Sequence, residues 1–249
     1  MALQKAWYGD KKWVWLLLPL TLLFFCLSNL GDEPKLMQHR LPCPVVIDPK
    51  RVRGANFLYE EHGCDVIICD DGLQHYALQR NFEIVVMDGR GVGNGFLMPM
   101  GPLRESVTRL NTVDAVVFNG QPHTDILISL NKTALLTLEP NQWINVKSGE
   151  CQSSLMIQDA TALAGIGDPK RFFATLSNMG ITCDKTIGFP DHYAYKLADI
   201  PKGMVLMTEK DAVKCKSLAH DNCWYLQVSG NISENLYSML DKKLEIYQR

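Results

Sequence analysis

The segment Val66–His75 reads VIICDDGLQH, an apolar run that is followed at once by two aspartates and a glycine. Continuous apolar strands that end in a polar turn are typical of a parallel sheet buried on both faces. Similar apolar runs recur at residues 43–47, 84–87, 115–118 and 205–207. The sequence therefore predicts an α/β protein with a mostly parallel sheet flanked by helices.

Segments with helical signals lie between and after these runs. We expect four helices, over residues 33–40, 169–178, 208–218 and 233–247. Asp168 is a candidate N-cap with Pro169 in the first turn behind it, and the sequence TEKD at 208–211 resembles a capping box. Between them, Leu135–Ser148 predicts a small hairpin or inter-domain connection that turns at Glu139–Asn141.

The composition limits the class of protein. The chain has 249 residues, of which 47% are hydrophobic and 21% are charged, as in ordinary globular proteins. A net charge of −2 gives no global electrostatic signal for nucleic-acid binding. Its eight cysteines form no C-x-x-C pair, which favours a reducing compartment over a disulfide framework.

An apolar segment precedes this α/β pattern. Residues Trp13–Leu30 read WVWLLLPLTLLFFCLSNL, without a charge, and lysines lie just before them. This length is near the lower limit of a membrane-spanning helix, roughly 17 residues, and Pro19 would kink it. A signal peptide and a buried core helix are the alternatives. We expect residues 1–30 to form a helix that lies at or dips into a membrane.

The aspartates of DDGLQH are the strongest chemical signal. Ligands of open α/β sheets bind at the carboxyl ends of the strands, and an Asp in that position of a phosphoryl-transfer fold holds Mg²⁺. A simple polar turn is the alternative, because Asp-Gly is a common turn pair.

Three further segments carry candidate side chains, and each has a structural explanation as well. Gly31–Pro34 contains Asp32, which caps a helix in the simpler reading. Met98–Glu105 ends in Arg104 and Glu105, which suit phosphate and metal binding or form a surface ion pair. Pro190–Tyr193 contains His192, which would tune a carboxylate or stay solvated.

Several familiar motifs are absent from the sequence. Residues Gly89–Gly95 do not complete G-x-G-x-x-G, which argues against a dinucleotide-binding dehydrogenase, and no G-x-S-x-G supports an α/β-hydrolase. The chain also has no G-x-x-x-x-G-K-[ST] phosphate-binding loop.

Six motifs taken in order resemble one family, the tetraacyldisaccharide 4'-kinases. They are GDEP (31–34), DDGLQH (70–75), GNGFLMPMGPLRES (93–106), AGIGDPKRFFATL (164–176), PDHY (190–193) and MTEKDAVKC (207–215). The resemblance implies a P-loop-kinase-like fold and transfer of the ATP γ-phosphate, with Mg²⁺, to the 4'-hydroxyl of a tetraacyldisaccharide 1-phosphate during lipid A synthesis. It also implies work at the cytoplasmic face of a bacterial inner membrane, on a lipid A precursor.

The resemblance further implies roles for individual residues. Asp32 matches the catalytic base, His192 the histidine that pairs with it, and Asp71 an active-site neighbour. Asp70 matches the Walker-B-type acid. The remaining implied contacts are Mg²⁺ binding by Asp70 and Glu105, and nucleotide binding by Asp70, Gln74 and Arg104. The predicted divisions are a membrane-associated helix (1–30), a kinase-like core (31–140) and a C-terminal α/β portion (141–249).

The chain departs from that family at one point. In the family a strand, a phosphate loop and the helix that it opens stand between the apolar helix and GDEP, whereas here Leu30 is followed directly by Gly31. We therefore expect a sheet without that strand and helix, with two open edges. The departure keeps a second hypothesis open, a non-catalytic membrane-associated protein that binds the lipid. A third and weaker one is a metal-dependent hydrolase that uses Asp70, Asp71 and His192.

Overall fold

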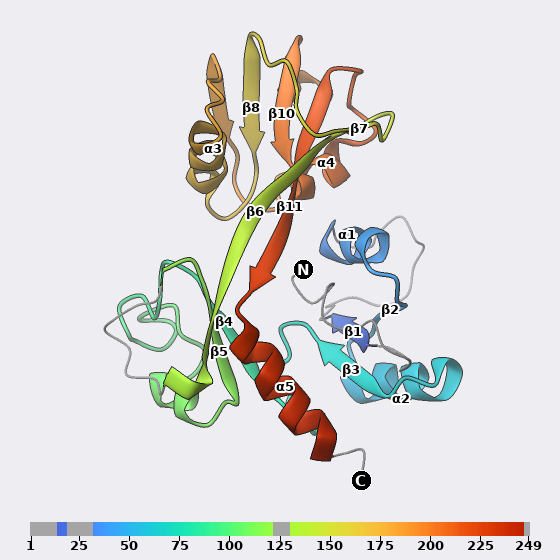
Figure 1. Cartoon of the computed structure of the whole chain (residues 1–249), viewed down its shortest axis with the longest axis vertical. Coiled ribbons are helices and arrows are strands. Elements are labelled where there is room, and N and C mark those ends of the chain that lie inside the picture. The colour runs from blue at the N-terminus through green and yellow to red at the C-terminus, as the bar shows by residue number, and fades with distance from the viewer. Residues whose placement is uncertain (1–13, 19–31, 122–129, 247–249) are drawn as a thin grey trace. The chain divides into compact units, whose positions relative to one another are not determined.

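The computed structural model describes residues 14–18, 32–121 and 130–246, and these divide into two compact units (Figure 1). Residues 14–18, 46–121, 130–139 and 230–246 form the first unit, and residues 32–45 and 140–229 form the second. Two long strands, β6 (Thr133–Asn145) and β11 (Cys223–Ile232), have residues in both units.

The first unit begins with a three-stranded sheet in the order β2-β1-β3. Its strands are β1 (Val14–Leu18), β2 (Val45–Ile47) and β3 (Val66–Cys69), and helix α2 (Arg51–His62) connects β2 to β3. β1 pairs with β3 in parallel, with Val14 opposite Val66. The DDGLQH loop therefore leaves the carboxyl end of a parallel strand, as the sequence predicts.

The predicted N-terminal helix is wrong for residues 14–18, which form strand β1. A short run of aromatic, β-branched and aliphatic residues suits a strand as well as a helix, and here pairing with neighbours decides. β1 lies between β2 and β3, so the facing edges of those two strands, which we expected to be open, are both paired. The rest of the predicted helix lies outside the described residues. None of the described helices is long and apolar enough to cross a membrane.

A second group of parallel strands completes the first unit. They are β4 (Ile84–Met87), β5 (Ala115–Asn119) and the first part of β6, with Ile84 opposite Ala115 and Val116 opposite Thr133. Helix α5 (Glu234–Ile246) covers one face, where Leu236 packs with Val117. The 3₁₀ helix η3 (Val107–Asn111) covers the other, where its Leu110 packs with Val116.

The second unit is a sheet in the order β6-β11-β10-β8-β9. Its further strands are β8 (Ala160–Ala164), β9 (Lys185–Gly188) and β10 (Met204–Thr208), while β7 (Cys151–Gln152) pairs antiparallel with β6. Successive residues of β10 face opposite sides. Leu206 packs on the side of helix α3 (Pro169–Asn178), and Met207 packs on the side of helix α4 (Glu209–Cys215). Helix α1 (Asp32–Arg40) lies against α4, and a short 3₁₀ helix, η5 (Leu197–Asp199), precedes β10.

The mostly parallel α/β fold and the four expected helices are confirmed. α3 begins at Pro169 with Asp168 in the N-cap position, although the Asp168 side chain makes no cap hydrogen bond. At the start of α4, the Thr208 side chain accepts a hydrogen bond from the Asp211 amide. The predicted hairpin is wrong, because residues 133–145 form one continuous strand. β6 pairs with β5 before Glu139 and with β7 after it, so both halves find partners without a turn. The domain divisions after residues 30 and 140 stay predictions.

Candidate functional site

Two arginines hold the backbone of the loop that follows β3. Arg51 of α2, only 3% exposed, donates a hydrogen bond to the carbonyl oxygen of Asp70 at 2.9 Å. Arg80 donates to the carbonyl oxygens of Gly72 and Leu73, each at 2.7 Å. A Cβ on Gly72 would lie 2.9 Å from that of Cys69, so only glycine fits there. The loop that carries both aspartates is thus fixed from two sides.

Two predicted catalytic residues have left-handed backbones. Asp71 has φ +44° and His192 has φ +58°, and Asp159 is the only other non-glycine residue of this kind in the described part of the chain. Such a conformation costs about 1–3 kcal/mol and often occurs at functional sites. The backbone geometry therefore sets apart these two motif residues together with Asp159.

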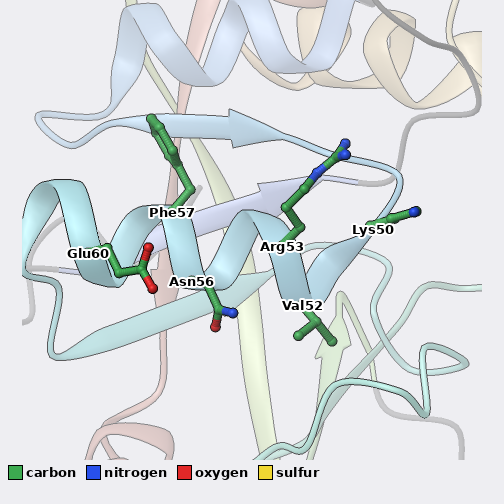
Figure 2. A pocket seen from close by; sticks show the side chains of 6 residues that line it. All are labelled: Lys50, Val52, Arg53, Asn56, Phe57 and Glu60. Carbon is green, nitrogen blue, oxygen red and sulfur yellow. The ribbon is translucent and has the colours of Figure 1, made fainter.

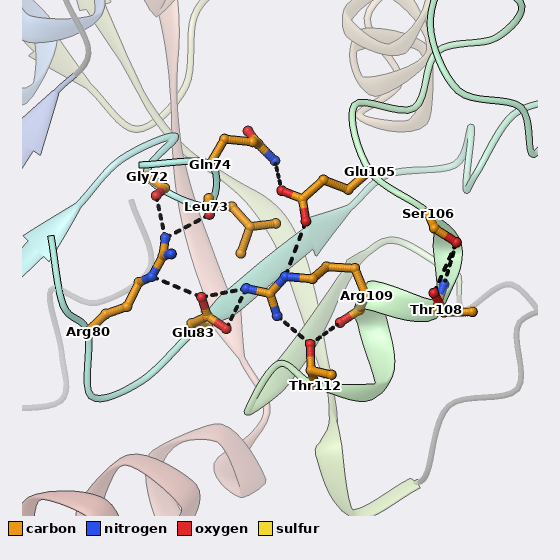
Figure 3. Close-up of polar contacts among 10 residues, drawn as sticks. All are labelled: Gly72, Leu73, Gln74, Arg80, Glu83, Glu105, Ser106, Thr108, Arg109 and Thr112. Atoms are coloured by element: carbon orange, nitrogen blue, oxygen red, sulfur yellow. Dashed lines mark hydrogen bonds and ion pairs between the residues drawn. The ribbon is translucent and has the colours of Figure 1, made fainter. Parts of the chain in front are cut away.

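A network of ionic side chains brings the DDGLQH loop to the segment 104–109 (Figure 3). Gln74 Nε2 donates to Glu105 Oε1 at 2.8 Å, and Arg109 Nε lies 3.2 Å from Glu105 Oε2. Arg109 also binds Glu83 at 2.7 Å, and Arg80 reaches the same carboxylate at 3.0 Å. The hydrogen bond from Gln74 lowers the pKa of the Glu105 carboxyl; partial burial opposes this shift, and Arg109 adds to it. Glu105 is therefore held as a carboxylate.

Arg104 makes the second link between these segments. Its Nη1 lies 3.1 Å from both carboxylate oxygens of Asp71 and 3.5 Å from Gln74 Oε1. Arg104 and Asp71 are both more than half exposed, at 60% and 52% of their side chains. Asp71, Gln74, Arg104 and Glu105 thus lie together, although their roles stay predictions. An exposed guanidinium in this place suits an incoming phosphate.

The carboxylates fit the chemistry of Mg²⁺. This ion takes one or two protein carboxylates and completes its shell with water and substrate phosphates. Among the described residues there is no group of three or more His, Cys, Asp or Glu side chains that would form a complete protein cage. Asp70 and the ionised Glu105 remain the residues that we expect to hold Mg²⁺, which would neutralise charge on bound phosphates.

Asp32 and His192 belong to the second unit. Asp32 is the first residue of α1, and its side chain lies outside the described part. The next residue, Glu33, accepts a hydrogen bond from Lys210 Nζ at 2.9 Å. Lys210 Nζ also donates to Asp191 Oδ1 at 3.3 Å, and Asp191 precedes His192. Lys210 thereby joins the immediate neighbours of both predicted residues.

A surface hollow lies apart from these side chains, on α2 (Figure 2). It is open to solvent, has a volume of about 530 Å³ and is lined by Lys50, Val52, Arg53, Asn56, Phe57 and Glu60. None of the residues that the motifs single out lines it. The hollow therefore does not belong to the candidate site.

The sequence did not indicate a role for several residues that hold the candidate site in place. They are Arg51, Arg80, Glu83, Arg109 and Lys210. Some of their partners are distant in the chain; Lys210 and Glu33 are separated by 177 positions, and no local spacing signals that contact. Arg80–Glu83 and Arg109–Glu105, by contrast, are three and four positions apart. Only Lys210 lay inside a motif, TEKD, and there a helix start explained it.

Comparisons with known proteins give the family. A family model described as "Tetraacyldisaccharide-1-P 4'-kinase" matches residues 14–245. The chain is 50% identical over 220 residues to a protein of Pseudoalteromonas atlantica named tetraacyldisaccharide 4'-kinase, covering 87% of this chain and 70% of that one. Relatives of the same name from Tolumonas auensis and Haemophilus influenzae are each 44% identical; the matches cover 88% and 82% of this chain and 66% and 61% of theirs.

A solved structure agrees with these relatives. The crystal structure of the "apo" form of LpxK from Aquifex aeolicus in complex with ATP has a TM-score of 0.73 and 27% identity. The match covers 92% of this chain and 78% of that one. The sequence motifs, the fold and the matched range agree, and the chain belongs to the tetraacyldisaccharide-1-P 4'-kinase family.

Proposed function

We propose that this chain transfers the γ-phosphate of ATP to the 4'-hydroxyl of a tetraacyldisaccharide 1-phosphate, a step of lipid A synthesis. The observation that carries the proposal is the meeting of the DDGLQH loop with Arg104 and Glu105 at the carboxyl end of β3. This is where an open α/β sheet binds ligands, and carboxylates beside a guanidinium suit a metal-bound triphosphate.

The first unit supplies the nucleotide contacts in this proposal. Asp70, Gln74 and Arg104 bind the nucleotide, and Asp70 and Glu105 hold Mg²⁺. Mg²⁺ held by these carboxylates would supply positive charge against the phosphate oxygens. Because Arg51 and Arg80 already fix the loop, binding costs little rearrangement of its backbone.

The second unit supplies the base. A sugar hydroxyl must lose its proton as the phosphoryl group arrives, and a carboxylate near a histidine performs this step. In this proposal Asp32 accepts the proton of the hydroxyl, and His192 tunes the Asp32 carboxylate. Asp71, in its left-handed conformation beside Arg104, completes the set of catalytic residues.

The second candidate function is lipid binding without catalysis. The observation that favours it is the absence of G-x-x-x-x-G-K-[ST], whose backbone amides and lysine normally anchor the phosphates. Both candidates place the chain at the cytoplasmic face of the bacterial inner membrane, because the acylated disaccharide stays in the bilayer. The apolar residues 13–30 support that place by composition.

Transfer of labelled γ-phosphate from Mg²⁺-ATP to tetraacyldisaccharide 1-phosphate in detergent micelles tests the proposal. We expect product from the wild-type chain, a loss of about 10²–10⁴-fold in Asp32→Asn, and normal product from Asp184→Asn, an exposed aspartate of the same unit. Failure of the folded wild-type chain to form product would reject the kinase proposal, and binding of tetraacyldisaccharide 1-phosphate without turnover would then support the lipid-binding alternative. Normal turnover by Asp32→Asn would reject the assigned base.

A further inference from the structure

The motif Thr208–Asp211 has no role in the proposed reaction, yet two of its residues bind α1, one at each end of the helix. Glu209 forms an ion pair with Arg40 at the end of α1, with Arg40 Nε donating to Glu209 Oε1 at 2.6 Å. Lys210 binds Glu33 in the first turn. These contacts bring α1, and with it Asp32, to the start of α4.

Asp211 fixes this start to the core of the second unit. Its side chain is fully buried, at 0% exposure, and accepts hydrogen bonds from the Gly165 amide at 3.1 Å and from the Tyr195 hydroxyl at 3.0 Å. The hydroxyl of Thr208 donates to it at 2.6 Å. Gly165 directly follows β8, and a Cβ there would lie 2.6 Å from the Tyr195 hydroxyl oxygen. Lys210 therefore extends from a rigid base.

The second bond of Lys210 reaches the loop that carries His192. Asp191 accepts from Lys210 with the same oxygen, Oδ1, that accepts from the His192 amide at 2.9 Å. The left-handed backbone of His192 is thus tied to a carboxylate that Lys210 holds. One ammonium group joins the loop 190–193 to the first turn of α1.

The link that Lys210 makes between α1 and the loop 190–193 depends on charge. Burial alone would lower the pKa of Lys210, but its bond to Glu33 raises that pKa above the usual value. Burial would likewise raise the pKa of Asp191, but its bond to Lys210 prevails and the pKa is lowered. Lys210 and Asp191 are therefore both ionised near neutral pH. Without the cation, the two carboxylates that share it would repel each other.

We propose that Lys210 is a positioning residue of this kinase, which holds the start of α1 and the loop 190–193 together so that Asp32 and His192 act as a pair. The inference deepens the proposed function and rests on it for its kinetic test. Lys210 acts through Glu33 and Asp191, the two carboxylates that its ammonium group binds.

Steady-state kinetics of the full chain provide the first test. In Lys210→Met we expect kcat to fall by about 10²-fold, because a displaced base loses alignment, while KM for ATP stays nearly constant. Lys210→Arg keeps the positive charge and has N–H donors for both carboxylates, so it should retain most of kcat. Lys216→Met, an exposed lysine at the end of α4, is the matched control and should behave as wild type. Wild-type kcat in Lys210→Met would overturn the proposal.

A double-mutant cycle with His192→Ala separates positioning from general destabilisation. If Lys210 acts through the Asp32–His192 pair, adding Lys210→Met to His192→Ala should cost far less than it does in the wild type. Independent, multiplicative losses would mean that Lys210 acts elsewhere, and would overturn the proposal.

Amide hydrogen exchange tests the link without any activity. We expect faster exchange in peptides covering residues 32–40 and 189–195 of Lys210→Met, and unchanged exchange in Lys216→Met. Faster exchange in a chain whose wild type forms no product would preserve the link and reject the kinase proposal. Unchanged exchange in both peptides would reject the link itself.

Discussion

The loop that follows β3 and the loop around His192 are held in different ways. Guanidinium groups of Arg51 and Arg80 bind the backbone of the first loop, and Arg104 binds its Asp71. The second loop is joined to α1 by the single ammonium of Lys210. Arginine offers a rigid fork with several donors, whereas lysine is one flexible point charge. Several guanidinium groups thus support the proposed nucleotide loop, whereas one ammonium group links the loop 190–193 to the first turn of α1.

The largest effect is expected from a substitution at one of the two ends of β3. Asp70 follows the strand and Asp65 precedes it. We expect Asp70→Asn to lower phosphoryl transfer by about 10²–10³-fold, as the loss of one preorganised electrostatic group does in other enzymes. Exposed Asp65 is the matched control, and Asp65→Asn should retain full activity. Equal rates in the two variants, measured with labelled ATP, would contradict the assignment of Asp70.

A smaller effect is expected when Glu105 is changed. Glu105→Gln keeps the shape of the side chain and removes the charge that we assign to Mg²⁺. We expect activity to fall by about 10–100-fold, with partial recovery at higher Mg²⁺ concentration. Titration of Mg²⁺ in the transfer assay measures this recovery, with Glu60→Gln in the hollow on α2 as control. If no Mg²⁺ concentration restores the activity of Glu105→Gln, Glu105 has only a structural role.

The burial of the network around Arg109 predicts a difference in stability. Arg109 lies between two carboxylates, Glu83 and Glu105, and all three side chains are at most 21% exposed. Arg109→Met should lower the free energy of unfolding by about 2 kcal/mol, because hydrogen bonds to charged groups are lost. Arg90→Met, which removes a pair whose arginine is 86% exposed, should cost at most about 0.5 kcal/mol. Urea unfolding of both variants measures the difference, and equal losses would refute it.

The smallest expected effect is a pH dependence of the same network. The pKa of Glu105 is lowered in the folded chain, so its contribution to stability is fully present above its unfolded pKa and is lost as the pH falls through its folded pKa. The difference in unfolding free energy between wild type and Glu105→Gln should therefore be largest near pH 7 and shrink in acid. Urea unfolding at pH 7 and at pH 3 checks the sign. If the difference in unfolding free energy grows in acid, the folded chain does not stabilise the ionised Glu105 carboxylate.

Much of the fold was predictable because its signals are local. The apolar run before Asp70 and the Asp168-Pro169 pair identified a strand and a helix from neighbouring residues alone. The error at Glu139–Asn141 shows the limit: turn-forming residues were overruled because strand partners lay on both sides of them. Residues 14–18 were misjudged for the same reason, since pairing with β3 is not visible in their own sequence.

The residues of the candidate site show the same difference between local and long-range signals. Asp70, Asp71, Glu105 and His192 stand in short motifs whose residue types already suggest chemistry. Lys210 binds Glu33 and Arg109 binds Glu83, partners that only the folded chain brings near. The sequence therefore singled out candidates for the reacting groups and missed side chains that hold them in place.

Titration of Mg²⁺-ATP into the full chain by calorimetry tests the central claim, that the loop after β3 serves the nucleotide and the loop around His192 serves the acceptor. The account predicts saturable binding by the wild type, its loss in Asp70→Asn, and its retention in Asp32→Asn and His192→Ala. Undiminished binding by Asp70→Asn, or no binding by the folded wild type, would contradict it.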